Sequence, residues 1–211
     1  MLLGLWQAIG FLAAAALVTI APGPDNLMVL SLGAARGRRQ GMVFGLGCAL
    51  GCLSHTTLAA LGISAAIAAS PVAYAGLKLV GGLYLLWLGL QAMRSAGRLA
   101  APGAPDRGAN GGLASLFFKG LAANAVNPKV ILFFLAFLPQ FVDASHGAAG
   151  WQTAQLGVLF TLQAALIFSA IGYFAGWFGR LLDRRPHAAT WLDRLAALVF
   201  MILGVKLIAQ P

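Results

Sequence analysis

Charged side chains are scarce inside the apolar stretches of this sequence, so the residues that could do chemistry are few. Asp25 follows Pro24 within one long apolar run, and Lys129 follows Pro128 within another. Asp25 is the only carboxylate that we place inside such a run. A lone charge in hydrocarbon costs about 2.5–3.5 kcal/mol on insertion scales, so each residue needs a partner or a wet cavity. The two residues therefore predict a polar site that binds a substrate or responds to protons, and their matching places after Pro24 and Pro128 lead to the hypothesis that they pair.

Both charges also have structural explanations. Asp25 could cap a helix that begins at Pro24. Lys129 could keep its stem among apolar groups while its ammonium reaches the membrane interface. Capping is compatible with substrate contact, so both roles stay open for Asp25.

A second group of reactive side chains lies on one helical face, because Cys48, Cys52 and His55 fall at positions i, i+4 and i+7. Soft metals prefer such ligands, and histidine also relays protons near neutral pH. One helix supplies at most three ligands, however, and no second cluster accompanies them. We expect the cysteines to be packing residues and predict no metal site. His55 is either a functional residue or a hydrogen-bonded packing residue.

The charged residues follow breaks in the runs that carry them. Two prolines flank a glycine at Pro22–Gly23–Pro24, and Asn127–Pro128 interrupts the other run; proline removes a backbone donor and breaks a helix. In hydrocarbon such a break persists only against protein or a water-filled cavity. Interrupted spans in corresponding places of two halves point to a transporter binding site. The candidate substrate-binding or coupling residues are therefore Pro22, Gly23, Pro24, Asp25, Asn26, His55, Asn127, Pro128 and Lys129.

Composition places these runs in a membrane. Of 211 residues, 60% are hydrophobic and only 9% are charged, whereas a soluble domain has about 25% charged residues. The excess of 14 Lys and Arg over 5 Asp and Glu falls in short gaps between apolar runs, which argues against nucleic-acid binding. No HExxH, G-x-S-x-G or Walker A motif occurs, so the sequence predicts neither an enzyme nor direct ATP coupling, and we expect no cofactor.

Six apolar runs reach the length of about 20 residues that a span requires, at roughly 3–33, 41–68, 72–93, 114–142, 152–179 and 191–209. The gaps after the first, third and fifth runs carry Lys or Arg, and the other two gaps carry none. The positive-inside rule then puts both termini in the periplasm. We therefore expect a multi-pass protein of the bacterial inner membrane, with the N-terminal run as a first span rather than a cleaved signal peptide.

The two halves of the sequence echo each other. Leu77, Leu83, Leu88 and Gly89 match Leu192, Leu198, Leu203 and Gly204 at identical spacing, with Gly81–Gly82 over Ala196–Ala197, and Pro24–Asp25 aligns with Pro128–Lys129. Three spans per half would invert the second half in the bilayer. We expect an all-α membrane protein that forms one transporter domain over residues 1–211. Its parts are a first repeat over about 1–94, a cytoplasmic linker over about 95–112 and an inverted repeat over about 113–211.

Motifs along nearly the whole chain also carry a family resemblance. They are the first break (residues 21–26), the basic turn at 36–41, Gly51–Cys52–Leu53–Ser54–His55, the segment 78–89, Asn127–Pro128–Lys129, and Leu138–Pro139–Gln140–Phe141. Together they resemble the lysine/threonine exporter family of bacterial amino-acid efflux proteins. The resemblance implies a six-span secondary transporter, a homodimer, that exports an amino acid or a derivative and is driven by the proton gradient. The alternative is an exporter of metal or other small ions, resting on Cys48, Cys52, His55 and Asp25.

Overall fold

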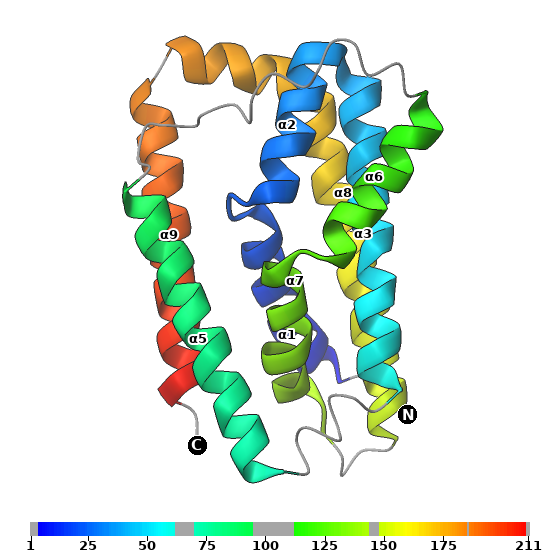
Figure 1. Ribbon diagram of the computed structural model, residues 1–211, viewed down its shortest axis with the longest axis vertical. Coiled ribbons are helices and arrows are strands. Elements are labelled where there is room, and N and C mark those ends of the chain that lie inside the picture. Colours follow the sequence, from blue (N-terminus) through cyan, green and yellow to red (C-terminus); the bar gives the residue numbers. More distant parts are fainter. Residues whose placement is uncertain (1–3, 62–69, 95–111, 144–147, 185, 210–211) are drawn as a thin grey trace.

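The computed structural model describes residues 4–61, 70–94, 112–143, 148–184 and 186–209, and every regular element within them is helical (Figure 1). The first half contains α1 (Leu5–Ile20), α2 (Pro24–Arg36), α3 (Arg38–Ala60) and α5 (Pro71–Arg94). The second half contains α6 (Leu113–Ala125), α7 (Pro128–Leu132), the π-helical turn η1 (Phe133–Phe137), the 3-10 turn η2 (Leu138–Phe141), α8 (Ala149–Arg184) and α9 (Pro186–Ala209). The predicted all-α class is confirmed for this part of the chain. Most of the predicted linker, residues 95–111, lies outside it.

Several elements are long and apolar enough to cross a membrane. Three do so as single helices: Arg38–Ala60, Ala75–Arg94 and Ala149–Phe178. The bent pairs α1–α2 and α6–α7, the latter extended through η2, bring the number of candidate spans to five. The helix α9 is 24 residues long and packs along α5. These lengths agree with a multi-pass membrane protein, while the count of six spans stays a prediction.

The helices form a central group and a separate pair. The helix α3 packs against α2, α6 and α8, whereas α5 packs mainly against α9, to one side of the others (Figure 1). Glycine allows the close contacts in the central group. Gly47 of α3 faces the carbonyl of Phe117, and Gly120 of α6 faces the carbonyl of Phe44, so a side chain at either glycine would overlap backbone. Such small-residue contacts are typical of helices packed within a membrane.

The ends of the elements sort into two groups. The beginning of α1 and the end of α9 lie at one end of the molecule, which we call the terminal end (Figure 1). The turn from α2 to α3, the end of α5 and the beginnings of α6 and α9 lie at the other end, which we call the basic end (Figure 1). Gly37, with a φ of 107°, makes the tight turn between Arg36 and Arg38 there. The described helix ends that flank the gaps rich in Lys and Arg thus share one end, as the alternation of these gaps along the sequence predicts.

Candidate functional site: two helix breaks and a cavity beside them

The first break lies where Pro22 and Pro24 remove two backbone donors. The helix α1 ends at Ile20, and α2 begins at Pro24 with a bend of 59° between them. The carbonyls freed at the end of α1 are satisfied from the next helix. Asn26 Nδ2 donates to the carbonyl oxygens of Thr19 at 2.7 Å and Ile20 at 3.1 Å. Asn26, a predicted site residue, therefore ties the two half-helices together.

The second break stops one helix and restarts another within three residues. The helix α6 ends at Ala125, and α7 begins at Pro128 after a bend of 48°. Proline suits this first helical position because its missing N–H would have no partner there in any case. Asn127 caps the new helix, since the backbone N–H of Lys129 donates to Asn127 Oδ1 at 3.0 Å.

Lys129 connects the two breaks. Its side chain is only 4% exposed, and its Nζ donates to the carbonyl oxygen of Ala21 at 3.1 Å. Gly23 leaves room for this ammonium, because a Cβ at Gly23 would lie 2.7 Å from Nζ. The lysine therefore does not extend to an interface; it satisfies a carbonyl that the first break freed.

Asp25 has a different partner from the one that we expected. It is 2% exposed, and Asn124 Nδ2 donates to its Oδ2 at 2.8 Å. The N-cap of α2 is Gly23, so Asp25 lies in the first turn of the helix rather than at the cap, where its charge suits the helix dipole. Asp25 and Lys129 are both described residues, and they form no ion pair with each other. The expected direct pair is thus replaced by two separate contacts.

Asn124 is a functional candidate that sequence reasoning missed. It is fully buried in the last turn of α6, and besides Asp25 it contacts α3. Its Oδ1 accepts from Cys52 Sγ at 3.3 Å, and its carbonyl oxygen bonds His55 Nε2 at 3.2 Å. Gly51 allows this close approach, since a Cβ at Gly51 would lie 2.8 Å from the Cβ of Asn124. The available signal was a polar amide in an apolar run, three residues before Asn127.

Two amide atoms at the breaks are buried and have no partner within the described structure. They are Oδ1 of Asn26 and Nδ2 of Asn127. The other end of each amide is engaged by backbone, which fixes the orientation of both side chains. The first break thus offers an unused acceptor, and the second offers an unused donor.

The cysteines behave as the packing residues that we expected. Cys48 and Cys52 are both fully buried. Across the described residues, no group of three or more His, Cys, Asp or Glu side chains could hold a metal ion. His55 lies against the ring of Phe134, with 5.7 Å between centroids. The metal-exporter alternative therefore gains no support from this cluster.

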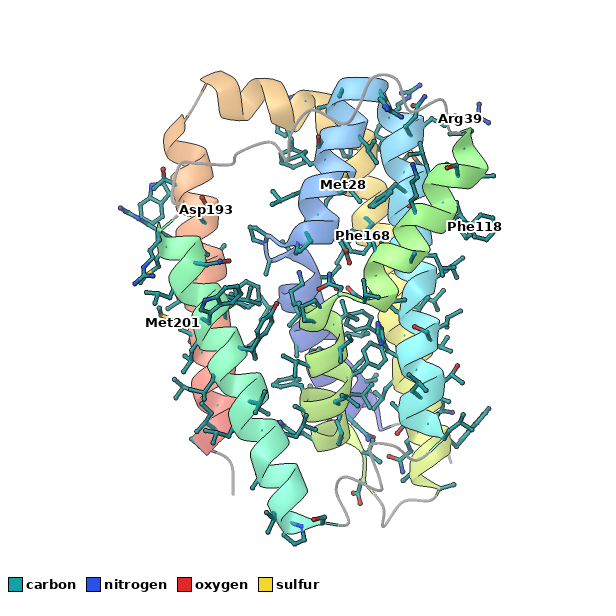
Figure 2. All side chains as sticks on the ribbon, viewed as in Figure 1. Met28, Arg39, Phe118, Phe168, Asp193 and Met201 are labelled. Atoms are coloured by element: carbon teal, nitrogen blue, oxygen red, sulfur yellow. The ribbon has the colours of Figure 1, made fainter. Side chains whose placement is uncertain are left out.

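A cavity of about 300 Å³ lies between the breaks and the α5–α9 pair. The breaks contribute Pro22, Gly23, Pro24, Leu27 and Lys129; α5 contributes Tyr84, Trp87, Leu88, Gln91 and Ala92; α9 contributes Asp193 and Phe200. Asp193 is only 4% exposed and lies in the half of α9 toward the basic end (Figure 2). We had placed Asp25 alone within the apolar runs, so this second buried carboxylate, inside the sixth run, was missed.

Phenylalanines fill the space between the breaks and the terminal end. Phe133 in η1 lies 5.9 Å from Phe11 and 5.1 Å from Phe160 between ring centroids, and Phe137 lies 5.6 Å from Phe141. Gln7 closes the end of this cluster, because its Nε2 donates to the carbonyl of Phe141 and to Gln152 Oε1. The region between the breaks and the terminal end is thus apolar and filled mainly by aromatic rings.

Comparisons with known proteins agree with this picture. Residues 16–210 match the family model described as LysE type translocator. An uncharacterized membrane protein of Pseudomonas aeruginosa is 36% identical over 196 residues, covering 90% of this chain and 89% of that protein. The threonine efflux protein of Escherichia coli K12 is 31% identical over 90% of this chain and 91% of its own length, and the leucine efflux protein of Enterobacter sp. is 26% identical over 93% and 92%. No solved structure matches this chain. The chain is therefore a transporter rather than an enzyme, and it belongs to the LysE type translocator family.

Proposed function

We propose that this protein is a secondary transporter that exports an amino acid or an amino-acid derivative, and that the substrate binds where the two helix breaks meet. The observation that carries the proposal is Lys129, a buried cation from one break that rests on the other break and lines a cavity of about 300 Å³. Buried charges within membrane segments mark substrate or ion pathways by default. The efflux proteins named among the relatives support amino acids as the substrate class.

The polar groups at the breaks suit both ends of an amino acid. The ammonium of Lys129 would bind the substrate carboxylate, and the unused Nδ2 of Asn127 would add a donor. Asp25 and the unused Oδ1 of Asn26 would accept from the substrate ammonium. On binding the substrate, the Lys129 ammonium would leave the Ala21 carbonyl. Substrate binding would therefore act directly on the geometry of the first break.

Export requires the site to open to each side of the membrane in turn. The cavity extends toward the basic end, and phenylalanines fill the terminal side. The basic end is the cytoplasmic side under the positive-inside rule, which leaves both termini in the periplasm of an inner-membrane protein. This conformation would then receive substrate from the cytoplasm. We propose that a proton entering from the periplasm neutralises Asp25 and loosens its contact with Asn124, which returns the empty carrier.

The interface of α5 and α9 supports two inverted three-span repeats. The sequence echo pairs Gly82 with Ala197 and Gly89 with Gly204. A Cβ at Gly82 would lie 3.0 Å from the carbonyl oxygen of Gly204, and one at Gly89 would lie 3.0 Å from that of Ala197. If each residue is replaced by its match in the other half, the contact of Gly82 with Gly204 becomes the contact of Ala197 with Gly89. A two-fold axis between α5 and α9 produces this relation, and such an axis in the membrane plane is typical of inverted repeats. The homodimer stays a prediction from the family resemblance.

Efflux from cells loaded with a panel of dipeptides tests the proposed function. Expression of the wild-type chain should speed the release of at least one amino acid, measured by amino-acid analysis of the medium. Lys129→Gln should abolish this effect because the variant lacks the carboxylate-binding charge. The matched control is Lys119→Gln, which makes the same change at an exposed position of α6. If the Lys129 variant releases every amino acid of the panel as fast as the wild type, the proposed site is wrong.

A further inference from the structure

Two glutamines at the terminal end hold the chain where it leaves η2. Gln152, in the first turn of α8, is 5% exposed and bonds both backbone groups of Asp143. Its Oε1 accepts from the Asp143 N–H at 3.0 Å, and its Nε2 donates to the Asp143 carbonyl oxygen at 2.7 Å. Gln7 of α1 donates from Nε2 to Gln152 Oε1 at 3.2 Å and also to the carbonyl oxygen of Phe141. These two side chains, which we call the glutamine latch, tie α1, η2 and α8 together.

The latched segment carries aromatic rings that fill the space between the breaks and the terminal end. Phe141, the last residue of η2, lies 5.4 Å from Phe11 of α1 and 5.6 Å from Phe137 between ring centroids. Phe137 stacks in turn on Phe133 at 5.4 Å. The chain runs from α7 toward the terminal end through these residues (Figure 1). A substrate that leaves the breaks toward the terminal end must therefore displace these rings.

The backbone of this segment is suited to movement. The π-helical turn η1 is followed directly by the 3-10 turn η2, so the register of the hydrogen bonds changes within residues 133–141. Pro139 has no N–H to donate, so a regular α-helix cannot run through η2 with all of its bonds. Turns of the π type are frequent at functional sites of helical proteins. The segment can thus shift without breaking a regular helix, and side chains rather than helical bonds fix its end.

We infer that the glutamine latch is the gate on the terminal side of the transporter. While its bonds are formed, the segment over residues 133–141 is held on α1 and α8 and the route to the terminal end is closed; when they break, the segment moves and the route opens. This inference rests on the proposed function, in which the terminal end is the side of release, and it adds the residues that control release. Neutral amides suit a gate, because one such hydrogen bond shifts an equilibrium by only about 2- to 12-fold. Both conformations therefore stay accessible to the carrier.

The test measures how fast a cysteine behind the rings reacts with a membrane-impermeant maleimide in sealed vesicles, without substrate. The reporter is Ala14→Cys, at a buried position one helical turn beyond Phe11 toward the first break. A second variant, Ala148→Cys, places a cysteine at an exposed position just before α8 and identifies the vesicles in which the terminal end faces the reagent. The chain without an added cysteine gives the background from the two buried native cysteines. In an otherwise wild-type chain, Ala14→Cys should react far more slowly than Ala148→Cys.

Breaking the latch should open the terminal side alone. Gln152→Leu and Gln7→Leu should each speed the reaction of the reporter about 10-fold, because the rate follows the open fraction while the closed state dominates. The matched control is Gln155→Leu, the same change one turn further along α8 and outside the latch, which should leave the rate unchanged. A cysteine on the cavity wall, Ala92→Cys, should react no faster from the basic end in Gln152→Leu, whereas a general loosening of the fold would speed both reactions.

Three results would overturn the gate. The first is fast labelling of Ala14→Cys in the otherwise wild-type chain, which decides the matter even where neither latch variant folds. The second is an unchanged rate in both latch variants. The third is an equal rise in Gln155→Leu or in the labelling of Ala92→Cys. Since the labelling needs no substrate, its outcome is distinguishable from that of the efflux assay that tests the proposed function.

Discussion

At the scale of residues, neutral partners hold the buried charges of the two breaks. Asp25 is bonded to the amide of Asn124, and Lys129 is bonded to a backbone carbonyl. Neither contact neutralises the charge that it holds. A bound zwitterion would do so at both positions, so under the proposed function the empty site is held by neutral partners and would favour an amino acid.

The Asp25–Asn124 contact predicts coupled stability. A hydrogen bond to a buried charged group contributes about 1.5–3 kcal/mol, so Asn124→Ala should lower the thermal transition of the detergent-solubilised protein. In Asp25→Ala with Asn124→Ala the losses should be less than additive, because either change alone already removes the contact. The control cycle combines Asn124→Ala with Thr57→Ala, whose hydroxyl bonds its own helix at Leu53; these losses should add. Additive losses in the Asp25 cycle would show that its carboxylate does not depend on Asn124.

Sequence reasoning identified residues whose effect is local and missed those whose effect depends on packing. Proline breaks a helix wherever it lies, so both breaks could be located from the chain alone. The partner of Asp25 depends on how α2, α3 and α6 are rotated against one another. The sequence predicts only the position of a residue along its helix axis. The direct pair with Lys129 was therefore a reasonable expectation that the rotation of the helices overrode. Asn124 and Asp193 were overlooked although each is a polar residue within an apolar run, a signal that the sequence contains.

At the scale of elements, the first break leaves carbonyls that side chains, rather than the helix backbone, bond beside a cavity. Replacing Pro22, Gly23 and Pro24 together with alanine should allow α1 to continue into α2, because alanine restores the backbone donors and favours helix. In a continuous helix, the Ala21 carbonyl that Lys129 now contacts would instead accept a backbone hydrogen bond within the helix. The variant should insert into the membrane and lose efflux.

Pro71→Ala provides the matched control for that change. Pro71 begins α5, where a missing N–H has little consequence, so this variant should keep both insertion and efflux. Insertion is measured by the amount of protein in the membrane fraction, and transport is measured by the dipeptide assay. Wild-type efflux from the triple variant would show that transport does not require the first break.

At the scale of the whole molecule, the described helix ends that flank the basic gaps lie at one end, and this gives a topology that can be measured. Reporter fusions after Gly37 and Gly103 should report the cytoplasm, and those after Ser70 and Gly147 should report the periplasm, because the former gaps carry Lys or Arg and the latter do not. A cytoplasmic signal at Ser70 or Gly147 would contradict both the six-span topology and the direction in which the cavity faces.

The central claim is that Lys129 binds the carboxylate of an amino acid where the two breaks meet. The most direct measurement compares the binding of norleucine with that of its methyl ester, which lacks the negative charge, by calorimetry on the purified protein. The wild type and Lys119→Gln should prefer the free acid by about 10- to 100-fold, whereas Lys129→Gln should bind both ligands with similar, weak affinity. A preference for the free acid that survives in Lys129→Gln would contradict the account.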